Sequence, residues 1–307
     1  MSLTVVRHLP RVQLGPVRRE GWPQRRLIPF RSMPALSRSG VTSSIAGVPG
    51  PPPPLPTLRE DWQRALCVAA HPDDLEYGVA SAVARWTSQG KQVSYLLATR
   101  GEAGIDGMDP AEVGPLREAE ERTGAREVGV EVVEFLDHRD GVVEYGVALR
   151  RDITRAIRRH RPEVVLGGAF TDRMVGGITN QADHRAVGLA TLDAARDAGN
   201  RWIFPELAEE GLQPWTGVRY VCLAGAHEPT HGVDVTGFVD RGIASLRAHR
   251  AYLDGLGAEA FDPAAFLSWV AAASGARLDV DSAVLLDVHE LIPDGPPPWA
   301  TPPNLSE

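Results

Sequence analysis

The sequence predicts a three-layer, Rossmann-like α/β fold with a mainly parallel sheet. Short apolar runs alternate with longer amphipathic segments along most of the 307 residues. This alternation is typical of β-α-β units, and continuous apolar runs suit strands that are buried on both faces. Hydrophobic residues make up 43% of the chain, which is normal for a globular protein. We find no internal repeat.

Six apolar runs are predicted to be strands. They are ALCVAA (65–70), QVSYLLAT (92–99), VEVVEFL (130–136), EVVLGGA (163–169), YVCLAGA (220–226) and AVLLDV (283–288). A helix is expected after the first strand, because Leu75, Val79, Val83 and Trp86 recur at helical spacing. Further helices are predicted over 115–127, 146–160, from about 184, and over 238–254.

The two ends of the chain differ in composition from its middle. Residues 1–60 are rich in Arg, Pro and Ser and end in a proline cluster, which favours extended polyproline II. We expect residues 1–60 to be a disordered extension, or a start assigned too early with Met33 as the alternative. Residues 61–292 are expected to form the folded domain, and 293–307 a Pro-rich tail.

Charge and composition narrow the range of partners and compartments. The net charge is −8, so no nucleic-acid partner is expected. No apolar run is long enough to span a membrane, so no membrane partner is expected either. RRLIPF (25–30) resembles a twin-arginine export signal, but the residues that follow it carry Arg and Ser where such a signal has an apolar region. Cys67 and Cys222 lie in apolar runs and are expected to be buried free thiols, and we expect a cytoplasmic protein.

Polar residues follow two of the predicted strands directly. His71, Asp73 and Asp74 come after the first strand, and Asp183 and His184 open the helix that follows the fourth. Ligands of such sheets bind beyond the carboxyl ends of the strands. Two histidines and a carboxylate match a catalytic zinc site with an open position. The structural alternative is that Asp74 or Asp183 caps a helix and that His71 is merely packed.

Five motifs occur in an order that resembles one enzyme family. They are AHPDDLEYG (70–78), TRGEAG (99–104), LREAE (116–120), DHRDG (137–141) and DHRAVG (183–188). Together they resemble the PIG-L/LmbE-like family of zinc-dependent N-acetylglucosaminyl deacetylases, over roughly residues 64–255. The resemblance implies one Zn²⁺ per chain, with Fe²⁺ as the alternative metal. Its implied ligands are His71, Asp74 and His184.

The resemblance also implies a reaction. Attack of a zinc-bound water, with Asp73 as general base, would remove the N-acetyl group of an amino sugar or a related N-acyl conjugate. Arg117 would contact this small-molecule substrate. Two alternatives stay open: a thiol S-conjugate amidase with the same chemistry, and a pseudoenzyme that keeps its metal and only binds a ligand. The sequence is also compatible with a homo-oligomer.

One position departs from the family pattern. Gln181 stands where the family commonly has a histidine, and glutamine cannot supply a titrating proton to the leaving amine. His231 is the candidate acid, since it follows the fifth strand and should lie over the same edge. His227 is the second candidate, and the alternative is that Asp73 returns its captured proton. Asp183 is expected to orient a neighbouring group.

HEPTH (227–231) matches the zincin pattern H-E-x-x-H, but we do not expect a zincin site. That motif requires a helix, on which its two histidines share one face. Pro229 would break such a helix.

Overall fold

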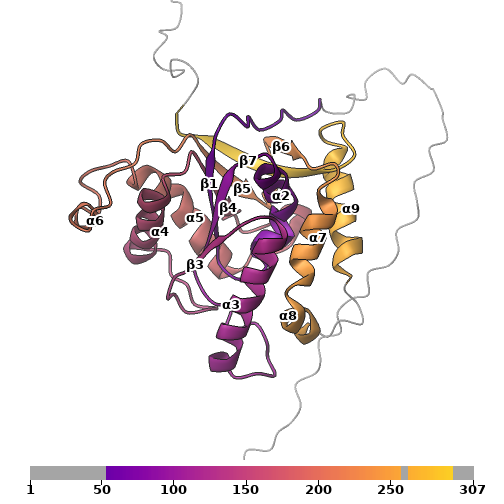
Figure 1. The fold of residues 1–307 in the computed structure, drawn as a ribbon, viewed down its shortest axis with the longest axis horizontal. Coiled ribbons are helices and arrows are strands. Elements are labelled where there is room, and N and C mark those ends of the chain that lie inside the picture. Colours follow the sequence, from indigo (N-terminus) through magenta and orange to yellow (C-terminus); the bar gives the residue numbers. More distant parts are fainter. Residues whose placement is uncertain (1–52, 257–261, 293–307) are drawn as a thin grey trace, which may run out of the picture. The chain divides into compact units, whose positions relative to one another are not determined.

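The computed structural model describes residues 53–256 and 262–292, and these residues contain a seven-stranded sheet in the order β3-β2-β1-β4-β5-β7-β6 (Figure 1). The strands are β1 (Arg64–Ala69), β2 (Gln92–Leu97), β3 (Val132–Phe135), β4 (Val164–Gly168), β5 (Tyr220–Ala224), β6 (His231–Asp234) and β7 (Ala283–Glu290). β1 to β5 are mutually parallel, whereas β7 is antiparallel to both β5 and β6. The predicted fold class is confirmed.

Helices connect the strands and cover both faces of the sheet (Figure 1). They are α1 (Asp74–Gly78), α2 (Ala80–Ser88), α3 (Pro110–Glu127), α4 (Val147–His160), α5 (Ala182–Asp197), α6 (Glu206–Glu209), α7 (Val239–Arg247), α8 (Arg250–Gly255) and α9 (Pro263–Gly275). A short 3₁₀ turn spans Val175–Gly177. Among the helices of the described residues, none has the length and apolar character that a membrane crossing requires.

The alternating side chains of β1 define two cores. Cys67 and Ala69 belong to the core shared with α1, α2 and α3. Leu66 and Val68 belong to the opposite core, which α4 and α5 cover. β1 is therefore apolar on both faces, as a central strand of a three-layer fold must be. Cys67 and Cys222 are buried free thiols, as predicted, and burial raises the pKa of each.

The helices differ from the prediction at several places: α1 and α2 stand where one helix was expected, and α6 and α9 were not predicted. The expected helix over 238–254 is interrupted between α7 and α8, at the fully buried His249. α9 was not predicted, because apolar residues occur on all sides of this helix and its sequence therefore shows no amphipathic pattern. Its buried residues are Leu267, Ala271 and Gly275. Its start is nevertheless clear in the structure: the Asp262 carboxylate accepts a hydrogen bond from the N–H of Ala264.

The packed chain begins before residue 61. Leu58 is buried, and its N–H donates to the carbonyl of Gly232 at 2.9 Å. The N–H of Leu55 donates to the carbonyl of Arg277 at 2.8 Å. The segment over 53–60 thus joins the fold, while residues 1–52 and the predicted tail over 293–307 lie outside the described residues.

The strand order reverses beside β1. From β1 the chain moves to β2 and β3 on one side, and then returns to β4 and β5 on the other. In parallel sheets, ligands bind where the order reverses, beyond the carboxyl ends of the strands. That position lies between the ends of β1 and β4.

Candidate metal and catalytic site

His71, Asp74 and His184 meet beyond the carboxyl ends of β1 and β4. His71 follows β1, Asp74 opens α1, and His184 lies in the first turn of α5, which follows β4. One donor atom from each residue lies within 4.8 Å of the other two. The Asp74 carboxylate is 3.0 Å from Nε2 of His184 and 3.6 Å from Nδ1 of His71. The structure therefore brings the three predicted ligands together.

Backbone donors hold the Asp74 carboxylate in place. Its Oδ2 accepts hydrogen bonds from the N–H groups of Ala70 and His71, at 3.1 and 2.9 Å. Burial opposes ionisation of this group, but the imidazoles of His184 and His71 outweigh that effect. They hold the pKa of Asp74 well below its usual range. The side chain is thus an anion aimed at both histidines.

Each imidazole also has an outward partner. Nε2 of His71 lies 3.1 Å from Asp140 Oδ1 and 3.3 Å from Asp183 Oδ2, and Nδ1 of His184 lies 3.1 Å from Asn180 Oδ1. Ligand histidines in metalloproteins commonly donate their second N–H to such oxygen acceptors. This arrangement directs Nδ1 of His71 and Nε2 of His184 toward Asp74.

The donor set fits a divalent metal ion. Nε2 of His184 is buried and has no hydrogen-bond partner within the described part of the chain, although Asp74 is close. Burial lowers the pKa of His71, but Asp140, Asp183 and Asp74 raise it to about 12. Without a metal, these carboxylates therefore hold a proton on the ring. Two imidazole nitrogens and one carboxylate suit Zn²⁺ or Fe²⁺.

Asp73 has a strained backbone and separate partners. Its φ is 87°, in the left-handed region that a residue with a Cβ rarely adopts. Its N–H donates to Glu121 Oε2 at 3.1 Å, and its Oδ2 accepts from Arg117 Nη2 at 2.9 Å. Burial raises the pKa of Asp73 to about 7, although Arg117 opposes this change. A carboxyl group with this pKa can gain and lose a proton near neutral pH.

Arg117 is buried, and only 2% of its surface is exposed. Besides Asp73, its guanidinium donates to the carbonyls of Pro72 and Gly101. A Cβ on Gly101 or on Gly104 would lie 2.4 Å from Nη1 of Arg117, so glycine at these positions makes room for the side chain. In the structure Arg117 holds Asp73; its predicted contact with substrate stays a prediction.

Asp140 is a site residue that sequence reasoning did not single out, although it lies in the quoted DHRDG motif. Its Oδ1 faces His71, and its Oδ2 accepts from the N–H of Ala103 at 2.8 Å. Glu102 accepts a hydrogen bond from the N–H of Asp140. This bond connects the loop over 99–104 to the loop over 137–141. Only the fold, which brings Asp140 to His71 and Gly141 to Asp183, reveals this contact.

Asp183 lies inside α5 and does not cap it, because the N-cap residue is Gln181. Its two carboxylate oxygens accept from the N–H groups of Gly141 and Val143, at 2.7 and 3.1 Å. The capping alternative is wrong for Asp74 as well, since the N-cap of α1 is Asp73, whose side chain makes no capping bond.

His231 is not brought to this cluster. It lies in β6, four strands from β1, and strands spaced about 4.8 Å apart put these two roughly 19 Å from each other. Its Nδ1 is 3.0 Å from Thr230 Oγ1. His231 pairs with Leu286, which also pairs with Ala224 at the end of β5, so His231 lies at the expected edge of the sheet but four strands away from the metal cluster. HEPTH, which contains His227 and His231, is not helical, as predicted.

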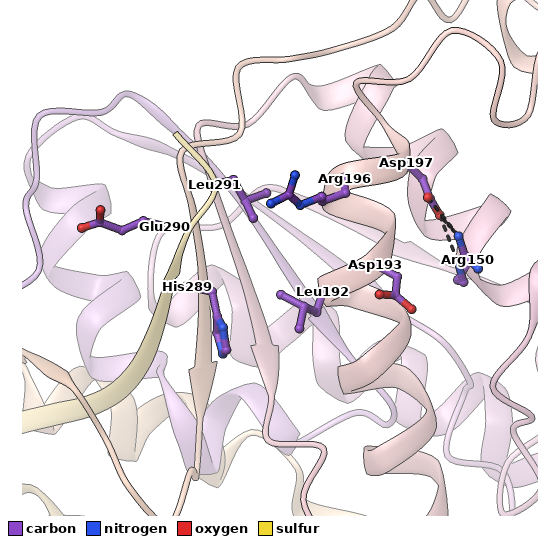
Figure 2. A pocket seen from close by; sticks show the side chains of 8 residues that line it. All are labelled: Arg150, Leu192, Asp193, Arg196, Asp197, His289, Glu290 and Leu291. Atoms are coloured by element: carbon purple, nitrogen blue, oxygen red, sulfur yellow. Dashed lines mark hydrogen bonds and ion pairs between the residues drawn. The ribbon is translucent and has the colours of Figure 1, made fainter. Parts of the chain in front are cut away.

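A cavity of about 420 Å³ lies elsewhere, between α4, α5 and β7 (Figure 2). It is lined by Arg150, Leu192, Asp193, Arg196, Asp197, His289, Glu290 and Leu291. Figure 2 shows Arg150 paired with Asp197 at its wall. None of these residues belongs to the metal cluster. Glu290 pairs with the first residue of β5, which places this end of the cavity toward the amino edge of the sheet.

The sequence is similar to those of known deacetylases. The sequence model of the PIG-L family, described as GlcNAc-PI de-N-acetylase, matches residues 66–195. A diacetylchitobiose deacetylase of Thermococcus kodakarensis is 29% identical over 193 residues, or 62% of this chain and 70% of that protein. A 1D-myo-inositol 2-acetamido-2-deoxy-alpha-D-glucopyranoside deacetylase of Kineococcus radiotolerans is 31% identical, over 61% of this chain and 68% of that protein.

The fold has a solved counterpart in N,N'-diacetylchitobiose deacetylase from Pyrococcus horikoshii. The TM-score is 0.66 at 23% sequence identity, and the match covers 75% of this chain and 85% of that one. The sequence matches and the clustered motifs together define the class. The chain belongs to the PIG-L family.

Proposed function

We propose that this protein is a metal-dependent deacetylase, which hydrolyses the N-acetyl group of an amino sugar or a related N-acyl conjugate. The observation that carries the proposal is that two carboxylates adjacent in the sequence have different partners. Asp74 joins His71 and His184 in a metal-binding set, while Asp73 is held beside it by Arg117. The deacetylases similar in sequence support the choice of an acetamide substrate.

The ligands for the metal would be His71, Asp74 and His184. When bound, Zn²⁺ or Fe²⁺ would supply Lewis acidity, which polarises an amide carbonyl and makes water more acidic. Asp140, Asp183 and Asn180 would hold the two rings in their binding orientation.

Asp73 would move the proton. As water adds to the acetamide carbon, one of its protons passes to the Asp73 carboxylate. The C–N bond then breaks, and the same proton passes to the nitrogen, so that acetate and a free amine leave. A carboxyl pKa of about 7 suits both transfers. Because the structure does not bring His231 to the site, Asp73 alone would serve as base and then as acid.

The test is an assay for products. The metal-loaded protein is incubated with N-acetylated glycosides that differ in their aglycone, and with an N-acyl conjugate of a small thiol. We expect acetate and free amine in equal amounts from at least one glycoside, and loss of that activity on chelation. Turnover of the thiol conjugate alone would support the amidase alternative. Tight binding of a glycoside without products would support the pseudoenzyme.

A further inference from the structure

Behind Asp73 lies a second group of ionisable side chains, made of Glu76, Glu121 and His249. All three are buried, and His249 and Glu121 have no exposed surface. Nε2 of His249 is 3.7 Å from Oε2 of Glu76 and 3.7 Å from Oε2 of Glu121. We call these residues the Glu–Glu–His cluster. The metal-binding set does not include them.

The cluster contacts Asp73 directly. Oε2 of Glu121 accepts the N–H of Asp73, the residue whose φ of 87° is strained. A strained backbone persists only where its surroundings hold it. Arg117, one helical turn before Glu121 on α3, binds the carboxylate of the same aspartate. One face of α3 therefore fixes both the backbone and the side chain of Asp73.

His249 links α3 to the junction of α7 and α8. Oγ of Ser245 on α7 lies 3.0 Å from Oε1 of Glu76 and 2.8 Å from the carbonyl oxygen of Gly124, so its single proton can be donated to either acceptor. The N–H of Ala251 at the start of α8 donates to Glu120. Beyond it, the ring of Tyr252 lies 4.2 Å from the guanidinium of Arg117. The imidazole thus occupies the point where α1, α3, α7 and α8 converge.

We propose that Glu121 and His249 are positioning residues for Asp73, which hold its carboxylate in line with the metal-binding set. This inference rests on the proposed function. Packing alone would not require ionisable groups here, because buried charges are costly unless they are paired. The cluster instead pairs an imidazole with two carboxylates, and it uses one of them to bind the backbone of the proposed base.

A double-mutant cycle tests the proposal. Glu121→Ala should lower kcat by roughly 10- to 100-fold, with KM and the metal content of each chain nearly unchanged. Glu121→Gln should retain more activity, because its amide oxygen can still accept the N–H of Asp73. In the Asp73→Asn background, Glu121→Ala should cost less than about threefold, since the group that it positions is already disabled. His249→Gln should behave in the same way with a smaller effect.

Glu112→Ala is the matched control, because Glu112 is an exposed residue on the same helix. It should leave kcat unchanged in both backgrounds. If Glu121→Ala lowers kcat by the same factor in the unmodified protein and in the Asp73→Asn variant, the residue acts through general stability and the inference is wrong. If Asp73→Asn is itself fully active, the proposed function fails instead. Melting temperatures of all variants separate both results from misfolding.

Discussion

Asp73 and Asp74 are consecutive residues, yet their carboxylates have different partners. Asp74 faces His184 at 3.0 Å, and Asp73 faces Arg117 at 2.9 Å. Burial raises the pKa of Asp73 to about 7, whereas the two imidazoles hold the pKa of Asp74 well below its usual range. A pair of carboxylates whose environments separate their pKa values is typical of an acid–base site.

Gly104→Ala should lower activity without unfolding the protein. The added Cβ would lie 2.4 Å from Nη1 of Arg117 and would displace the guanidinium that holds Asp73. Since a flexible side chain can move aside, we expect a small change in melting temperature but roughly a tenfold or larger loss of kcat. Gly107→Ala is the control, because a Cβ there has nothing within 4 Å. Equal activity of the two variants would contradict the proposed role of Arg117.

Asp183→Asn should weaken metal binding. The substitution replaces a carboxylate that faces Nε2 of His71 and accepts two backbone N–H groups. Loss of such a partner typically costs roughly 10- to 100-fold in metal affinity. Competition with a chromogenic chelator measures this change. Asp172→Asn, on the exposed loop before α5, should leave the affinity unaltered; if it weakens binding equally, the effect of Asp183 is not specific.

The stability of the fold should fall as pH rises through the range set by His249. Burial lowers the pKa of His249, but Glu76 and Glu121 raise it to about 9 from the usual 6.5. The folded protein therefore keeps a proton that the unfolded chain releases. The contribution is fully present below pH 6.5 and is lost as pH approaches 9; it amounts to about 3 kcal/mol. Urea unfolding of the unmodified protein and of His249→Gln, at several pH values between about 6 and 9, measures the contribution of His249 to the free energy of unfolding. Parallel pH dependence of the two would exclude this source.

Leu58→Ala should destabilise the fold by about 2–4 kcal/mol, because it empties a buried position in the core beneath α2. Denaturant titration measures the free energy of unfolding. Thr57→Ala, at the exposed neighbouring position, should change it by less than about 0.5 kcal/mol. If Leu58→Ala leaves the free energy of unfolding unchanged, the segment over 53–60 adds little to the stability of the fold.

Much of the architecture could be predicted, because local patterns determine it. The apolar runs predict β1, β2, β4 and β5 nearly to the residue, and motifs beyond β1 and β4 predict which three side chains meet in the candidate metal site. The partners of those side chains could not be predicted in the same way. His71 and Asp183 are 112 residues apart, and only the strand order brings them together.

The remaining differences have the same origin. His249 occupies an apparently continuous helical segment, and nothing local in the sequence signals that two distant carboxylates meet it where the helix is interrupted. The position of His231 was inferred from its place after β5. That inference missed the antiparallel strand β7, which is inserted between β5 and β6 and moves His231 away from the site.

The most direct measurement is metal content and turnover of two variants at adjacent positions, Asp73→Asn and Asp74→Ala. The account predicts that Asp73→Asn keeps about one metal ion per chain and loses roughly 10²–10⁴ in kcat, because only the proton acceptor is removed. Asp74→Ala should lose the metal, and activity with it. Full activity of Asp73→Asn, or equal loss of metal from both variants, would contradict the division of roles between the two carboxylates.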